Sequence, residues 1–191
     1  WVDKGHSVTP SWARGSMTPT SRSRWGAGGR WVRKDDAVVE DVISAARSGL
    51  SPDAILIDHT TTLPALTAER AQRLHSQGVK YLHCPVFMGP AAARSAQGSM
   101  MVSGPAAFYE TVKAQLAAMT GRLEYMGERT DLAAVNKLFG NAMIIGVSAV
   151  MADILTIAQA STVDAQDAIK LLGLLDLNAM VAGRGMNMAK G

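Results

Sequence analysis

The sequence has little of what stabilises a small secreted protein. Only one of its 191 residues is a cysteine, Cys84, which excludes a disulfide framework and a zinc site built from several cysteines. A lone thiol is typical of a reducing compartment, so we expect a cytoplasmic protein. Aromatic residues make up 5% of the chain and charged residues 18%, yet 48% is apolar, which excludes disorder along the whole chain. This length and composition predict one ordinary domain or two small units.

The excess of basic over acidic residues is confined to the first 35 residues. They hold seven Lys or Arg against two acids, all four tryptophans, and no sustained helical or strand period. Such an arm can bind nucleic acid by phosphate neutralisation and stacking, but without a recognisable module it is more often solvated surface, so we do not expect a nucleic-acid partner. The sequence starts at Trp1 with no methionine and no signal-peptide pattern, and we expect an incomplete chain.

Between residues 36 and 126, patterns typical of helices and strands alternate. The apolar run 54–57 lies between Pro52 and Asp58, which is typical of a strand buried on both faces of a parallel sheet. The alternation predicts an α/β fold with a partial doubly wound, Rossmann-like sheet and right-handed crossovers. The expected helices cover residues 36–46, 64–76 and 105–119, and the expected strands cover 54–57, 79–86, 98–104 and 122–126.

From residue 131 onward the patterns are helical only, and one long helix is expected over 132–160. Its apolar segment 138–152 is shorter than the roughly 20 residues that a membrane span needs, and it contains Asn141 and Ser148. We therefore expect no membrane partner. The better interpretation is a helix buried inside the protein or inside a dimer, with the methionines of this half filling gaps in a core.

Four motifs follow one another along the chain. They are IDHTTTLP at 57–64, HCPVFMG at 83–89, a stretch at 93–104 that ends MMVSG, and KLFGN at 137–141. In this order they resemble the β-hydroxyacid dehydrogenase family, which includes the 3-hydroxyisobutyrate dehydrogenases and is related to 6-phosphogluconate dehydrogenase. The resemblance implies an irregular remnant of a dinucleotide-binding domain at 1–35, the C-terminal part of that domain at 36–129, and a truncated helical domain for substrate and dimerisation at 130–191.

The resemblance places the catalytic box at Lys137 and Asn141. It implies that Lys137 exchanges a proton with the substrate hydroxyl while hydride moves to or from nicotinamide, and that Asn141 holds the substrate. Residues four apart on a helix share a face, and an ammonium group that is partly desolvated in a cleft has a pKa closer to neutrality, as acid–base work requires. The alternative is a surface lysine with a capping or core asparagine.

Cofactor contacts are expected from Asp58, Thr60 and Thr61, because ligands of open α/β sheets bind at the carboxyl ends of the strands. The alternative is a threonine-rich turn in which Thr62 caps the helix that follows. The resemblance also places Arg14 where a guanidinium group could meet the 2′-phosphate of NADP. NADP or NAD is therefore the expected cofactor. The histidines show no metal-ligand spacing, and we expect no metal.

The chain also departs from the family pattern. Phe87, Met88 and Gly89 stand where the family has Ser-Gly-Gly for a substrate carboxylate, so a standard small hydroxy acid is not the expected substrate. The phosphate-binding G-x-G-x-x-G does not occur in the sequence. We expect an NAD(P)-dependent oxidoreductase that acts on a small molecule and forms homo-oligomers through the long helix. The alternative is a non-catalytic fragment or descendant that serves as a helical dimerisation module.

Overall fold

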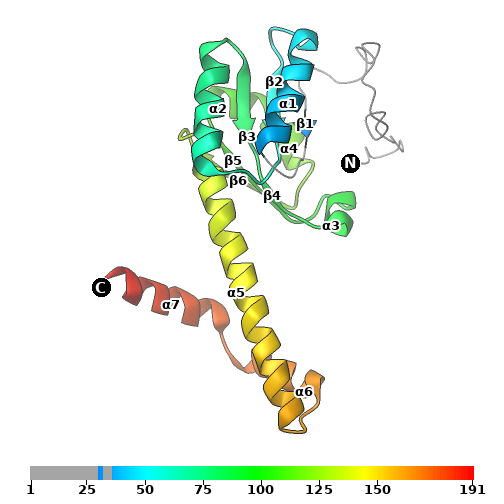
Figure 1. Cartoon of the computed structure of the whole chain (residues 1–191), viewed down its shortest axis with the longest axis vertical. Helices are drawn as coiled ribbons and strands as arrows, with labels where there is room; N and C mark the ends of the chain where they lie inside the picture. The colour runs from blue at the N-terminus through cyan, green and yellow to red at the C-terminus, as the bar shows by residue number, and fades with distance from the viewer. Residues whose placement is uncertain (1–29, 32–35) are drawn as a thin grey trace. The chain divides into compact units, whose positions relative to one another are not determined.

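The structure, a computed structural model, describes residues 30–31 and 36–191 (Figure 1). It consists of two compact units, of which the first ends at Gly140 and the second comprises Asn141–Gly191. The predicted cofactor contact Arg14 lies outside the described residues.

The first unit contains a mixed six-stranded sheet. Strand β2 pairs in parallel with β1 on one side and β3 on the other, and β5 pairs in parallel with β6. Strand β5 runs antiparallel to β3 and β4, so the sheet is only partly of the predicted parallel kind. The strands are β1 (Arg30–Trp31), β2 (Ile55–Asp58), β3 (Lys80–His83), β4 (Val86–Phe87), β5 (Ser99–Ser103) and β6 (Arg122–Gly127).

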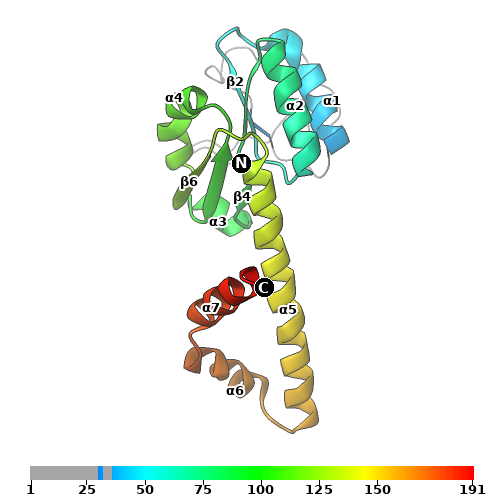
Figure 2. The same ribbon diagram turned by 90° about the vertical axis from the view of Figure 1, so that its left-hand side faces the viewer.

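Helices cover both faces of this sheet, as Figure 2 shows for α1 and α2 on one side and α4 on the other. Side chains alternate along β2: Leu56 packs with the α1–α2 cluster, whereas Ile55 and Ile57 pack with the cluster that includes α4. The strand is buried on both faces, as its apolar run predicts. The helices of this unit are α1 (Asp36–Ala46), α2 (Pro64–Ser76), α3 (Pro90–Arg94), α4 (Ala106–Ala117) and the start of α5 (Leu132–Ala160).

One expectation about strands is wrong, and one short strand was not visible in the sequence. The single strand expected over 79–86 is two strands, β3 and β4, because Pro85 has no backbone N–H to donate to a ladder. The N-terminal 35 residues show no strand period in the sequence, yet Arg30 and Trp31 pair with Ile57 and Asp58. Two residues are too few for a period to be visible in the sequence.

The second unit is helical, as predicted, but it has no core of its own. After α5 the chain forms α6 (Ala165–Lys170) and α7 (Leu177–Ala189), and among residues 141–191 only Ala158 is buried. Within the single chain most of the long helix is not buried and Met186 and Met188 are exposed, which contradicts burial inside the protein, whereas burial inside a dimer stays a prediction. By length and composition alone, α5 would be able to cross a membrane.

Candidate active site

Asp58, at the carboxyl end of β2, is fully buried and organises the loop that follows. Its Oδ1 accepts a hydrogen bond of 2.8 Å from the backbone N–H of Thr60, and its Oδ2 accepts one of 2.8 Å from the Tyr81 hydroxyl. Burial and the neighbouring Asp58 carboxylate raise the pKa of the Tyr81 phenol, so the hydroxyl keeps its proton and remains a donor. Asp58 thus acts as a brace for the threonine loop.

A buried arginine compensates the charge of this carboxylate. Arg70, on α2, is almost completely buried, and its Nη1 lies 3.6 Å from Asp58 Oδ2. The same guanidinium group donates to Asp36 Oδ1 at 2.6 Å and to Glu40 Oε1 at 2.8 Å, both on α1. The backbone N–H of Leu63 donates to the other oxygen of Asp36 at 3.1 Å. These bonds tie α1, α2 and the carboxyl end of β2 into one rigid group.

The imidazole of His83 continues the polar network at the end of β3. Its Nε2 lies 2.9 Å from the Thr60 carbonyl and 3.2 Å from the Thr62 hydroxyl. A carbonyl oxygen can only accept, so Nε2 carries a proton. Burial lowers the pKa of His83 and favours the neutral ring. The Thr62 hydroxyl is also 2.6 Å from the Thr67 hydroxyl. Thr62 therefore braces the loop, and the alternative that it caps α2 is wrong, because Leu63 holds the N-cap position.

Lys137 lies near the start of α5, where the helix is fastened to the sheet. The Ser103 hydroxyl, at the end of β5, donates to the Thr130 carbonyl at 2.8 Å and accepts from the Ala133 N–H at 3.1 Å. Two bonds join the Arg129 guanidinium group to the carboxylate of Asp131 and lower the pKa of that carboxyl group. Asp131 and Ala133 thus both belong to the contacts at this helix start.

The ammonium group of Lys137 is withdrawn from solvent. The residue is 8% exposed, and its Nζ donates a hydrogen bond of 2.8 Å to the carbonyl of Val86, on β4. The ring of Phe87 covers the same nitrogen, with 3.5 Å between Nζ and the ring centroid. Burial lowers the pKa of Lys137, which brings the group closer to the range in which it can both take and give a proton.

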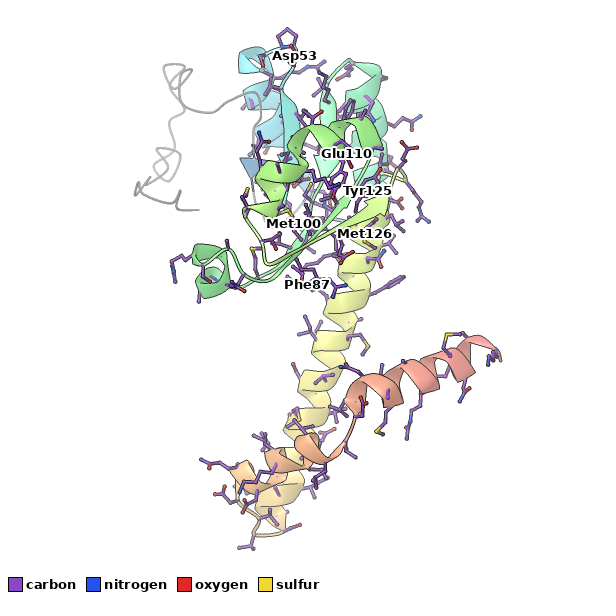
Figure 3. The ribbon with its side chains drawn as sticks, turned by 180° about the vertical axis from the view of Figure 1, so that it is seen from behind. Asp53, Phe87, Met100, Glu110, Tyr125 and Met126 are labelled. Atoms are coloured by element: carbon purple, nitrogen blue, oxygen red, sulfur yellow. The ribbon has the colours of Figure 1, made fainter. Side chains whose placement is uncertain are left out.

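The turn after β4 holds the other predicted substrate contacts. Figure 3 labels Phe87 and Met100, which come from the neighbouring strands β4 and β5. Gly98 has a φ of +89°, and a Cβ added there would lie 2.7 Å from the Phe87 carbonyl oxygen, so only glycine lets the turn approach this closely. Beside the turn lies a pocket of about 200 Å³. It is lined by His59, Val86, Met88, Gly89, Pro90, Ala93 and Met100.

The structure brings some of the predicted residues together and separates others. Lys137 meets Phe87, and Met88 and Gly89 line the pocket that also borders Val86. Asp58 and Thr60 are fully buried, whereas Thr61 is exposed at the end of β2. Their contacts with a cofactor stay predictions, as does the role of Asn141, which follows Lys137 by four residues on α5 and begins the second unit.

Several residues of the site were not anticipated. Gly140 faces Phe87, since a Cβ added to this glycine would lie 2.2 Å from Phe87 Cζ. Arg70 and His83 hold the threonine loop, and the Val86 carbonyl holds Lys137. The sequence around Arg70 gives no indication that this side chain is buried. The contact between Gly140 and Phe87 likewise depends on the tertiary structure.

Comparisons with known proteins agree with this architecture. L-threonate dehydrogenase of Cupriavidus necator is 31% identical over 104 residues, and the match covers 54% of this chain and 35% of the relative. The mitochondrial 3-hydroxyisobutyrate dehydrogenase of Drosophila melanogaster is 32% identical over 107 residues, and the match covers 54% of this chain and 33% of the relative. The chain thus spans about a third of the length of these curated relatives.

Solved structures show the same fold. The V8 variant of the imine reductase of Myxococcus stipitatus, in complex with NAD+, superimposes with a TM-score of 0.72 at 18% identity, covering 86% of this chain and 56% of that one. The same reductase in complex with NADP+ gives a TM-score of 0.70 at 17% identity, covering 86% and 56%. These likenesses confirm the predicted Rossmann-like α/β fold.

A family match identifies the first unit. The family described as the NAD-binding domain of 6-phosphogluconate dehydrogenase matches residues 31–127, just over half of the chain. The match runs from β1 to β6 and includes the threonine loop, β4 and the pocket. The chain therefore belongs to the family of the NAD-binding domain of 6-phosphogluconate dehydrogenase, a family of NAD-binding oxidoreductases that includes hydroxyacid dehydrogenases.

Proposed function

We propose that Lys137 is the acid–base group of an NAD- or NADP-dependent oxidoreductase that interconverts an alcohol and a carbonyl compound. The observation that carries the proposal is the setting of Lys137: a nearly buried ammonium group with a lowered pKa, held by the Val86 carbonyl beside a pocket in an NAD-binding domain. A lysine whose pKa is lowered by burial in such a place is typical of a functional site.

The residues at the end of β2 fit the nicotinamide half of the cofactor. Thr61 presents a hydroxyl to solvent there, on a loop that Asp58 and His83 hold rigidly, and ligands of open α/β sheets bind at this edge. Thr61 would hold the nicotinamide ribose or amide, whereas Asp58 and Thr60 would position the loop from within. NAD or NADP supplies the hydride acceptor, and this chain's residues manage the proton.

The geometry suits Lys137 to that task. A neutral Nζ that donates one N–H to the Val86 carbonyl keeps its lone pair for the substrate. The lone pair takes the proton of the substrate hydroxyl while hydride leaves the carbon that bears this hydroxyl. The alcohol thereby becomes a carbonyl compound. In the reverse direction, the ammonium group returns the proton to the carbonyl oxygen. Asn141, one helical turn further along α5, would hold the substrate.

The test is a lysine substitution in the full-length protein that carries this sequence. Lys137→Met keeps the length of the side chain and removes the proton carrier, and turnover of NADH or NADPH should fall by about 10²–10⁴-fold. Cofactor affinity, followed by the fluorescence of the reduced cofactor, should change little. Equal turnover of the two proteins would refute the assignment. Lys113→Met, on the surface of α4, is the matched control.

We also propose that the long helix pairs with a second copy of the chain. The exposed part of α5 carries large apolar side chains along most of its length, and a patch of this kind marks an interaction surface. The side chains are Phe139, Met143, Ile144, Ile145, Val147, Val150 and Ile157. Sedimentation at rising concentration should show a shift from monomer to dimer. Ile145→Glu should abolish the shift, and a monomer at all concentrations would contradict the proposal.

A further inference from the structure

The aromatic ring of Phe87 lies against the ammonium group of Lys137. Its centroid is 3.5 Å from Nζ, and the Val86 carbonyl takes one of the N–H bonds of the same nitrogen. An ammonium group is attracted to a ring face by the negative charge of the π system. An anion is repelled by the same face. An anion that approaches Lys137 across the ring is therefore repelled.

Gly140 provides the room that the ring needs. A Cβ at this position would lie 2.2 Å from Phe87 Cζ and 3.0 Å from Cε1 and Cε2. The colliding atoms are the far end of a side chain, so a methyl group there would push the ring aside without displacing backbone. Gly146, in the same helix, has no atom within 4 Å of its would-be Cβ. Glycine disfavours a helix, so its presence needs an explanation. The contact with Phe87 explains the glycine at position 140, whereas no contact explains the glycine at position 146.

The neighbouring pocket offers no fixed charge to an anion. Of the side chains that line it, only that of His59 can ionise. The His59 ring is fixed by a bond of 2.7 Å from Nδ1 to the Cys84 carbonyl, and the other linings are apolar or backbone. Burying a carboxylate without a partner is costly, whereas an apolar group gains from leaving water. Val86 belongs to both places, since it lines the pocket and holds Lys137.

Resting on the proposed function, we propose that Phe87 determines the substrate class of this site. The ring covers Lys137 and excludes a carboxylate next to the reacting carbon, and the pocket beside Val86 receives an uncharged, apolar substituent. The substrate is then an uncharged alcohol or carbonyl compound with a branched or cyclic apolar group. Gly140 is the positioning residue that lets Phe87 adopt this place.

Two probes of the same shape test the charge preference. Isobutyramide carries an amide where isobutyrate carries a carboxylate. Their binding is followed by the ¹³C-methyl NMR signals of Met88 and Met100, which line the pocket. The pH is 8.5, where an ordinary imidazole is neutral. Isobutyramide should bind at least about tenfold more tightly than isobutyrate. In Phe87→Ser the ratio should fall, because Lys137 can then pair with the carboxylate. Tighter binding of isobutyrate to the parent, or an unchanged ratio in the variant, would overturn the proposal.

The cover over Lys137 is tested by chemical labelling. Acetylation of Lys137 by acetic anhydride, quantified by mass spectrometry, should accelerate by about threefold to thirtyfold in Phe87→Ser, the range that an ammonium–ring attraction corresponds to. Gly140→Ala should accelerate it too, by displacing the ring. Phe139→Ser and Gly146→Ala are the matched controls, since Phe139 is exposed and Gly146 faces open space. Equal labelling of the Phe87 and Phe139 variants would show that the ring does not cover the lysine.

Both measurements need neither cofactor nor turnover. Absence of the charge preference in the parent protein, with intact turnover, would refute the role of Phe87 and leave the proposed oxidoreductase standing. A preserved preference in a protein that never oxidises NADH or NADPH would refute the oxidoreductase and leave an apolar binding site guarded by Phe87. The two failures are therefore distinguishable.

Discussion

The two units use apolar residues in opposite ways. In the first unit, strands and helices enclose two apolar clusters, and charged side chains such as Arg70 and Asp58 are buried only with partners. In the second unit the apolar side chains of α5 and α7 are exposed, and Ala158 alone is buried. Similar hydrophobicity therefore leads to a folded core in one unit and to an open surface in the other. The first unit can be stable on its own account, whereas the second depends on what covers it.

The largest effect should come from removing the buried guanidinium group of the first unit. Arg70→Met leaves the fully buried Asp58 carboxylate uncompensated and should lower the free energy of unfolding by about 3–5 kcal/mol. Urea denaturation measures the loss, and hydrogen exchange should confine it to residues before Gly140. Arg129→Met, which breaks an exposed pair, should cost far less. Equal losses in the two variants would show that the buried network stabilises the protein no more than an exposed ion pair does.

Truncating one apolar side chain in each unit tests the contrast directly. Leu56→Ala, in the fully buried centre of β2, should cost about 2–5 kcal/mol. Ile145 is 69% exposed, and Ile145→Ala should cost no more than about 0.5 kcal/mol in dilute solution. A cost for Ile145→Ala that grows with protein concentration would show that a second copy covers the helix. A large, concentration-independent cost would contradict the exposure of this side chain.

The pH dependence of stability should also belong to the first unit. Burial lowers the pKa of His83 below its ordinary value of 6.5, so the folded state binds fewer protons than the unfolded state below that pH. The free energy of unfolding should then fall as the pH drops below about 6.5, by up to about 1.4 kcal/mol per pH unit. His83→Gln should flatten the slope, whatever its effect on stability at neutral pH. A parent without a slope would refute the prediction.

The smallest effect separates the two glycines of α5. Gly146→Ala adds a methyl group to open space and should stabilise the helix by about 0.5–1 kcal/mol. Gly140→Ala must displace the Phe87 ring and should lose that gain or reverse it. Thermal unfolding of the two variants and of Gly140→Ala/Phe87→Ala measures the difference. The added Phe87→Ala change should restore the gain at position 140, and two equally stabilised single variants would rule out the contact.

Local patterns were sufficient to predict the elements that punctuation marks clearly. The helices 36–46, 64–76 and 132–160 were predicted with the bounds that the structure shows, because Pro64, Gly78 and regular apolar spacing delimit them. The split at Pro85 and the short α3 were missed, since neither contains a full period. The exposure of α5 was missed because periodicity reports which residues are apolar and carries no information on what covers them.

The candidate site was predictable only in part. Lys137 was identified from a motif, and its burial beside β4 is consistent with the prediction of a desolvated group. Arg70 bonds with residues 30 and 34 positions away, and no local pattern indicates such pairs. The same holds for Phe87 and Gly140, whose contact depends on how α5 passes the end of β4. Residue types predicted the chemistry, whereas these contacts required the tertiary structure.

The bond between Lys137 and Val86 has a consequence for the time course of folding. It joins residues 51 positions apart, and contacts that close long loops form late because chain entropy opposes them. We expect β4 to pair with β5, and the Ser103 hydroxyl to bond to the start of α5, before the Lys137 ammonium group reaches the Val86 carbonyl. A nascent chain thus assembles its sheet before its reactive nitrogen is sheltered, and a protein halted at that stage would be compact yet chemically incomplete.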